Sequence, residues 1–126
     1  MFTATANVTG PMFDSRGVQV VEDYTAAVEL AVADDAAQRW RAGLRGRVRS
    51  GTGYYVDHIT VDLTTGDPAV TDGGVVYGPW LEGVGDRNAS TGWPGYGQRR
   101  QAAQQSEARA VDIGERQWPR FAARLE

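Results

Sequence analysis

Residues 16–49 carry one long run of helical periodicity, which restricts the fold of this 126-residue chain more than any other feature. Its apolar residues recur at steps of three and four, as in an amphipathic helix: Val21, Tyr24, Val28, Ala31, Val32, Ala36, Trp40, Leu44 and Val48. Unbroken, this helix would be on the order of 50 Å long at 1.5 Å per residue, longer than a domain of this size is wide. We therefore expect the helix either to project from the rest of the domain or to kink, with Gly43 and Gly46 as the weakest points.

The rest of the chain predicts a small antiparallel sheet and a second helix. Four short segments have the alternation or the flanking turns of strands: residues 2–9, 54–63, 69–71 and 75–77. Helical spacing returns over 98–125, where Pro119 either kinks the helix or lies in the first turn of a new one. The prediction is an α+β fold, in which the long N-terminal helix and the C-terminal helix pack against the small antiparallel sheet.

An extended glycine-rich loop is expected over residues 83–97, which show no periodicity and hold five of the sixteen glycines. A loop this long inside a compact domain is usually functional or serves as an arm. The whole chain, 1–126, is expected to form a single domain, because two independent cores would be too small to be stable.

Composition excludes several classes of site. The chain has no Cys and a single His, so thiolate metal sites and cysteine nucleophiles are excluded, and a metal centre would need almost only carboxylates. The net charge of −3 argues against a dedicated nucleic-acid binder. No apolar run approaches the length of a transmembrane helix, and the N-terminus lacks the pattern of a secretory signal. We expect an intracellular protein with no membrane association.

Individual candidates for chemistry are weak. His58 lies on a predicted strand, where its neighbour Asp57 points to the opposite face and cannot orient it. Residues 83–88 resemble the opening of a dinucleotide-binding loop but lack its third glycine. The adjacent acids Asp34 and Asp35 are expected to face solvent. We therefore predict no catalytic, cofactor-binding or metal-binding residues, no cofactor, and no enzymatic activity.

Residues 75–83 are apolar and aromatic, with Glu82 as their only charge. A carboxylate in such surroundings needs a partner, and Arg87 or Arg99 could supply one. One interpretation is a core strand with a satisfied ion pair. The other is a self-association surface with aromatic anchors, in which the arginine pairs with Glu82 across or beside the contact between subunits.

Four segments of the chain resemble a known family: residues 51–55, 76–83, 85–88 and 95–96. Their sequences, GTGYY, VYGPWLEG, GDRN and GY, are similar to those of the small neck proteins of long-tailed bacteriophages, also described as tail-completion or head–tail joining proteins. The form in phages of high-GC Gram-positive hosts is the most similar. The family order is a long N-terminal helix, a small antiparallel sheet, a strand from tyrosine to glutamate-glycine, an extended loop and a C-terminal helix.

The resemblance implies a structural virion protein at the head–tail junction, made in the host cytoplasm. It would form a homo-oligomeric ring, expected to be sixfold, that joins the head connector to the tail and contacts neighbouring neck and tail proteins. DNA would pass through the ring without specific binding, and Asp and Glu are expected to face the lumen more than Arg does. Alternatives are a tail terminator ring, or a small ligand-binding or enzyme domain with residues 83–97 as a lid. The predicted subunit and partner interface comprises Tyr77, Trp80, Glu82, Arg87, Asn88, Trp93, Tyr96 and Arg99.

Overall fold

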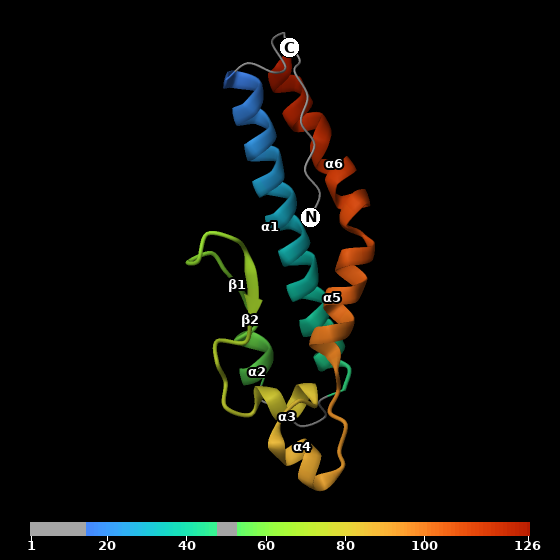
Figure 1. The fold of residues 1–126 in the computed structure, drawn as a ribbon. Coiled ribbons are helices and arrows are strands. Elements are labelled where there is room, and N and C mark those ends of the chain that lie inside the picture. The colour runs from blue at the N-terminus through green and yellow to red at the C-terminus, as the bar shows by residue number, and fades with distance from the viewer. Residues whose placement is uncertain (1–14, 48–52) are drawn as a thin grey trace.

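A computed structural model describes residues 15–47 and 53–126 of the chain. Helix α1 (Ser15–Arg45) runs along most of the molecule, and α5 (Gln98–Ala108) and α6 (Ala110–Ala122) return beside it in the opposite direction (Figure 1). A short 3₁₀ turn, η1 (Ala123–Leu125), follows α6. A two-stranded sheet and three short helices occupy one side and one end of this helical pair. The fold is α+β, as predicted.

Helix α1 is continuous from Ser15 to Arg45, so the expected kink at Gly43 is absent, and the helix does not project either, because other helices pack along it. At 1.5 Å per residue it is about 46 Å long, and α5 and α6 cover its length. Gly43 lies inside the helix instead of breaking it. A side chain at Gly43 would overlap the side-chain amide of Gln98, so this glycine lets the first turn of α5 lie directly against α1. Residues 48–49, part of the predicted helix, fall outside the described residues.

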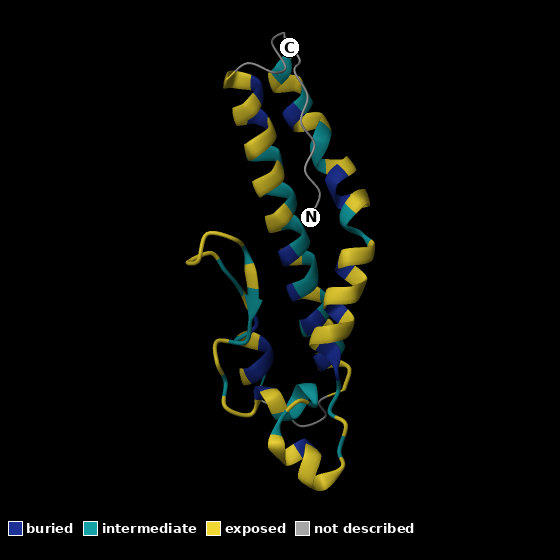
Figure 2. Cartoon of the chain, viewed as in Figure 1, coloured by how far each residue is buried: buried dark blue, intermediate teal, exposed yellow. Residues whose placement is uncertain are grey.

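Two groups of side chains hold the helices together, a larger buried group and a smaller aromatic group that is partly buried (Figure 2). The larger group lies where α1, α2, β1 and α5 meet: Ala37, Trp40, Leu44, Tyr55, Val56, Ile59 and Ala102. At the other end of α1, the ring of Tyr24 packs edge-on against those of Trp118 and Phe121, at 5.0 and 5.7 Å between centroids. The Tyr24 hydroxyl also donates a hydrogen bond of 2.9 Å to the carbonyl of Gly114.

The sheet is smaller than predicted. It contains β1 (Thr60–Asp62) and β2 (Ala69–Thr71), antiparallel, with Val61 opposite Val70. The strand expected over 54–63 is wrong in its first half, because Tyr54–Asp57 form helix α2. Tyr55, Val56 and Ile59 are all buried. Residues i, i+1 and i+4 can point to the same side of a helical turn, whereas in a strand the neighbours Tyr55 and Val56 would point to opposite faces.

The strand predicted over 75–77, and the one implied by the family resemblance over 77–83, are also absent. Gly73 and Gly74 both adopt positive φ, and the amide of Gly78 donates to the carbonyl of Val75, so the chain turns here. Helix α3 (Gly78–Glu82) follows immediately. This turn leaves Val76 exposed to solvent rather than in a core strand. The strand predicted over 2–9 lies outside the described residues.

The C-terminal helix is divided at Arg109 rather than at Pro119. The Arg109 amide donates to the carbonyl of Ser106, three residues back, and α6 begins at Ala110. Pro119 lies inside α6, which contradicts one of its two predicted roles, a place in the first turn of a new helix. The break allows Ile113 and Phe121 to be buried in α6 while Ala102 is buried in α5.

Asp35 joins the two helical arms and does not face solvent as predicted. Its Oδ2 atom accepts hydrogen bonds of 2.7 Å from the Nε of Arg39 and from the hydroxyl of Ser106, a residue that is 1% exposed on α5. Burial alone would raise the pKa of Asp35, but the hydrogen bonds from Ser106 and Arg39 outweigh it and lower the pKa below 3.8. The ionised carboxylate therefore stabilises the fold.

We expect Asp35→Asn to lower the free energy of unfolding by about 1 kcal/mol at neutral pH. Because the pKa is lowered in the folded protein, this contribution is fully present above the unfolded pKa and is lost as the pH falls through the folded pKa. The difference between wild type and variant should therefore shrink below pH 3.8 in urea titrations. Asp34→Asn, at the exposed neighbouring position, is the control and should change stability little. Equal losses in the two variants would contradict the assignment.

Candidate interaction surface

Residues 78–97 fold into a compact unit at the end of the molecule where α1 finishes (Figure 1). Helix α3 is followed by α4 (Asp86–Thr91), and an irregular segment then leads into α5. The expectation of an extended loop over 83–97 is therefore wrong for residues 86–91. Glycines end both helices, with Gly83 and Gly92 in the left-handed conformation.

Asn88 holds this unit together from inside. It is 6% exposed, and its side-chain oxygen accepts a hydrogen bond of 3.0 Å from the amide of Gly85. Its side-chain nitrogen donates to the carbonyls of Trp80 and Trp93, at 2.9 and 3.0 Å. One side chain thereby connects α3, α4 and the segment that follows. Asn88 was predicted as an interface residue, and the structure places it behind the surface, as its support.

The predicted aromatic residues do come together. The rings of Trp80 and Trp93 lie 4.3 Å apart between centroids, and Tyr96 packs edge-on against Trp93 at 5.2 Å. The guanidinium of Arg87 lies over the ring of Trp80 at 4.7 Å. Such contacts each contribute on the order of 1 kcal/mol and fix the orientation of large side chains. Tyr77, the residue that precedes α3, has its ring 5.6 Å from that of Tyr55.

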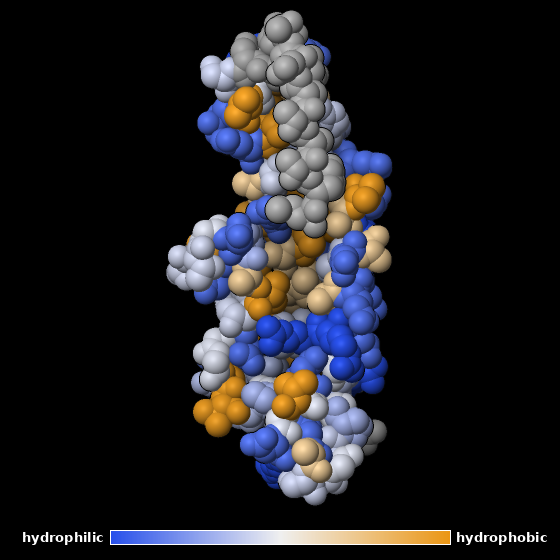
Figure 3. All heavy atoms as spheres, in the orientation of Figure 1, coloured by the Kyte–Doolittle hydropathy of each residue, from blue (hydrophilic) through white to orange (hydrophobic). Residues whose placement is uncertain are grey.

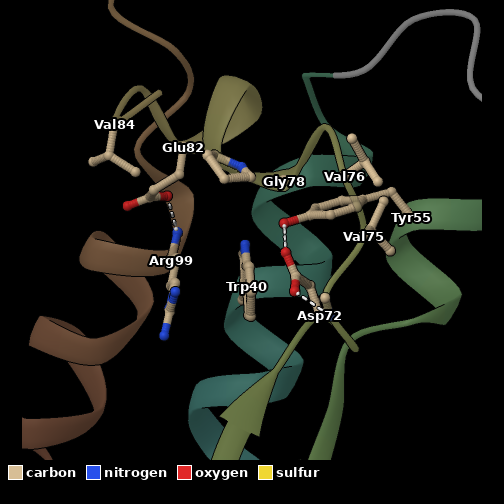
Figure 4. A pocket seen from close by; sticks show the side chains of 11 residues that line it. Trp40, Tyr55, Asp72, Val75, Val76, Gly78, Glu82, Val84 and Arg99 are labelled. Carbon is tan, nitrogen blue, oxygen red and sulfur yellow. Dashed lines mark hydrogen bonds between the residues drawn. The ribbon is translucent and has the colours of Figure 1, made fainter. Parts of the chain in front are cut away.

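Glu82 finds its partner in the backbone. Its two carboxylate oxygens accept hydrogen bonds from the amides of Arg99 and Arg100, at 2.9 and 3.1 Å, and Figure 4 shows the first of these. These amides belong to the first turn of α5, which has no internal acceptors for them and carries the positive end of the helix dipole. Within one chain the expected ion pair with a guanidinium is therefore replaced by a helix cap. The Arg99 guanidinium lies instead over the ring of Trp40, at 5.6 Å.

A cavity of about 310 Å³ lies beside this cap, between Trp40, Tyr55 and Asp72 (Figure 4). The Tyr55 hydroxyl donates to Oδ2 of Asp72 at 2.9 Å, and the amide of Gly74 donates to Oδ1 at 3.0 Å. Burial, together with the carboxylate of Asp72, raises the pKa of Tyr55 well above its usual value. Tyr55 and Asp72 are thus engaged in contacts that hold the turn at 72–78 against α2.

In the part of the chain that the structure describes, no three His, Asp or Glu side chains lie close enough together to hold a metal ion. His58 follows α2 rather than lying on a strand. Its Nδ1 donates to the carbonyl of Tyr54 at 2.6 Å, and its ring lies 4.0 Å from that of Tyr54. The imidazole therefore fastens the end of α2.

Exposed apolar side chains surround the aromatic cluster. Val76 is 94% exposed, Val84 72% and Tyr77 44%. We call the surface that they form with Pro79, Trp80 and Arg87 the aromatic end; it contains a shallow hollow of about 510 Å³. Exposed apolar residues are visible at the lower end of the molecule in Figure 3. Val76 and Val84 are not among the interface residues predicted from the sequence. Glycines lie close by on both sides of each, and this pattern could have indicated their exposure, because it favours turns over buried strands.

Over residues 15–47 and 53–126, no helix is long and apolar enough to cross a membrane. Comparison with known proteins found no match to this chain among protein-family models, curated proteins or solved structures.

Proposed function

We propose that this chain is a structural virion protein of a long-tailed bacteriophage, which forms a ring at the head–tail junction by self-association through the aromatic end. The observation that carries the proposal is the exposure of Val76, Val84 and Tyr77 on one surface. Clustered exposed apolar side chains on a small protein mark a contact with another macromolecule, and aromatic residues and arginine are frequent anchors of such contacts. The resemblance of residues 76–83 and 85–88 to phage neck proteins supports the location.

The aromatic end has a rigid support, as a binding surface requires. Behind it, Asn88 joins three backbone segments, and Glu82 fixes α3 to the first turn of α5. The rings of Trp80 and Trp93, packed against each other, leave little side-chain entropy to lose on binding. Preorganisation of this kind lowers the cost of association. This argument favours a protein contact over a mobile lid.

The net charge suits a subunit that surrounds passing DNA. With sixteen Asp and Glu against thirteen Arg, a ring of such chains has an excess of negative charge. Acidic side chains at the lumen would repel the phosphates and prevent the salt-dependent adhesion that arginine clusters cause. We propose that the aromatic end lies at the contact between subunits and that carboxylates face the channel.

The test is deletion of the gene from the phage genome that carries it, with expression of the chain from a plasmid. We expect the deletion to accumulate separate heads and tails, and wild type to restore infectious particles. Val76→Glu should fail to restore them, because it places a charge in the contact between subunits. Val76 is 94% exposed on the folded chain, so this substitution should not disturb folding. Leu63→Glu is the matched control. Leu63 is also an exposed apolar residue, but it lies in the β1–β2 hairpin, so this variant should restore infectious particles. Complete particles from the deletion alone would refute the proposal.

A further inference from the structure

An apolar groove runs along the molecule away from the aromatic end. It consists of two adjoining hollows of about 540 and 470 Å³, which share Val28, Glu29 and Ala110 in their lining. The first hollow lies between α1, the β1–β2 hairpin and α5, and the second continues between α1 and α6. Figure 3 shows apolar side chains gathered in the middle of the molecule, on the face turned to the viewer.

The groove is apolar at its floor and acidic at its edge. Val28, Val32 and Val70 are among the apolar residues that line the first hollow. Four exposed carboxylates line it, those of Glu29, Asp67, Glu107 and Glu115, and no arginine does so among the residues described. Such a surface favours an apolar partner that carries a positive charge.

We propose that this groove receives the aromatic end of a second copy of the chain, in a head-to-tail contact. The proposal rests on the ring function proposed above and names the surface that the aromatic end would bind. Val76 and Val84 offer projecting apolar groups for the floor. The guanidinium of Arg87 lies over the Trp80 ring. Arg87 takes part in none of the ion pairs found among the described residues, so its charge is available to a partner.

Charge favours this arrangement over contact between two grooves. A symmetric groove-to-groove dimer would bring Glu29, Glu107 and Glu115 of one copy towards the same residues of the other, and like charges at an interface are unfavourable. The aromatic end has one acid, Asp86, beside Arg87, so it is close to neutral. A contact between the acidic groove and the aromatic end therefore gains an attractive pair and avoids most of the repulsion.

The position of the two surfaces also fits a ring. A contact that uses two different surfaces of each subunit leaves one of each kind free in a dimer, so that further copies add until the ring closes. The aromatic end lies at one extremity of the elongated molecule, and the groove lies along its middle. Each copy would then contact one neighbour through its aromatic end and the other through its groove.

Mixing two defective variants tests the head-to-tail contact. Ala103→Glu changes an exposed residue of α5 that lines the groove, and Val76→Glu changes the aromatic end. We expect wild type to form assemblies larger than dimers by light scattering, and each variant alone to associate at least about tenfold more weakly. An equimolar mixture should form a heterodimer and nothing larger, because the two variants retain one intact groove and one intact aromatic end between them. Gln105→Glu, an exposed position elsewhere on α5, adds the same charge and should associate like wild type.

Three results would overturn the inference. If the mixture stays monomeric while wild type assembles, the two surfaces do not bind each other. If wild type is monomeric at concentrations on the order of 10 µM, the groove does not receive a second copy, although the particle experiment with the gene deletion still decides the proposed function separately. If Ala103→Glu lowers the stability of the dilute chain without changing association, another part of the same chain occupies the groove.

Discussion

Asn88→Ala is expected to lower the free energy of unfolding by about 3 kcal/mol, because it removes three hydrogen bonds from a nearly buried position. The loss leaves the carbonyls of Trp80 and Trp93 and the amide of Gly85 without partners. Urea titration followed by tryptophan fluorescence measures the change, because Trp80 and Trp93 lie on either side of the substituted residue. Hydrogen exchange should show faster exchange of the residue 78–97 amides, with α6 unaffected.

Asn88→Asp separates the roles of the two side-chain atoms. The aspartate keeps an acceptor for the amide of Gly85 but replaces the donor with an oxygen that faces two carbonyl oxygens. It should therefore destabilise the protein at least as much as alanine does. Ser90→Ala is the control, since Ser90 is exposed and donates only to the carbonyl of Arg87 in its own helix. An aspartate variant close to wild type in stability would contradict the role assigned to Asn88.

The sequence predicts the long helices well, because their stability depends on a pattern repeated over many turns. Trp40 and Leu44 are buried as the pattern predicts. Val21, however, is 48% exposed and its neighbour Val20 is buried instead, so the helix is predicted correctly but part of its buried face is not. The end of α1 is less predictable. Gly43 looks like a weak point in isolation, but its lack of a side chain is what accommodates Gln98 from a segment more than fifty residues later.

The short elements are poorly predicted, because three or four residues carry too little pattern to compete with tertiary contacts. Residues 54–57 alternate as a strand would, yet burying Tyr55, Val56 and Ile59 together against α1 requires a helical turn. Residues 75–77 have the composition of a strand, but the two left-handed glycines before them direct the chain into a turn. Both errors arise where one local pattern fits two conformations and distant residues decide between them.

The candidate interaction surface is predictable in part. That Glu82 needs a partner follows from its apolar neighbours, and the structure provides one. The identity of that partner does not follow from the sequence, because it consists of backbone amides. Every residue except proline has such an amide, so no residue type marks the ones that are free at a helix terminus. The clustering of Trp80, Trp93 and Tyr96 could be anticipated from their proximity in sequence, whereas the exposure of Val76 depends on how the turn is oriented.

Two glycines in equivalent positions should respond very differently to the same substitution. Gly83 ends α3 and Gly92 ends α4, and both have positive φ, +98° and +74°. Alanine at either position therefore incurs the cost of a left-handed backbone, about 1–2 kcal/mol. A methyl group at Gly92 would meet nothing within 4 Å, but one at Gly83 would overlap the carbonyl of Pro94.

We expect Gly92→Ala to lower the free energy of unfolding by about 1 kcal/mol and Gly83→Ala by about 3 kcal/mol, since only the latter adds a backbone clash to the conformational cost. The neighbouring hydrogen bond from the Tyr96 amide to the Leu81 carbonyl, 2.7 Å long, should break in Gly83→Ala as residues 94–96 move away from α3. Trp93 directly precedes that displaced segment, so its contact with the Trp80 ring and the fluorescence of the folded state should change in Gly83→Ala alone. Because the aromatic end rests on this contact, Gly83→Ala should also weaken self-association, and Gly92→Ala should not. Equal stability losses in the two variants would mean that the approach of Pro94 to Gly83 does not hold the aromatic end in place.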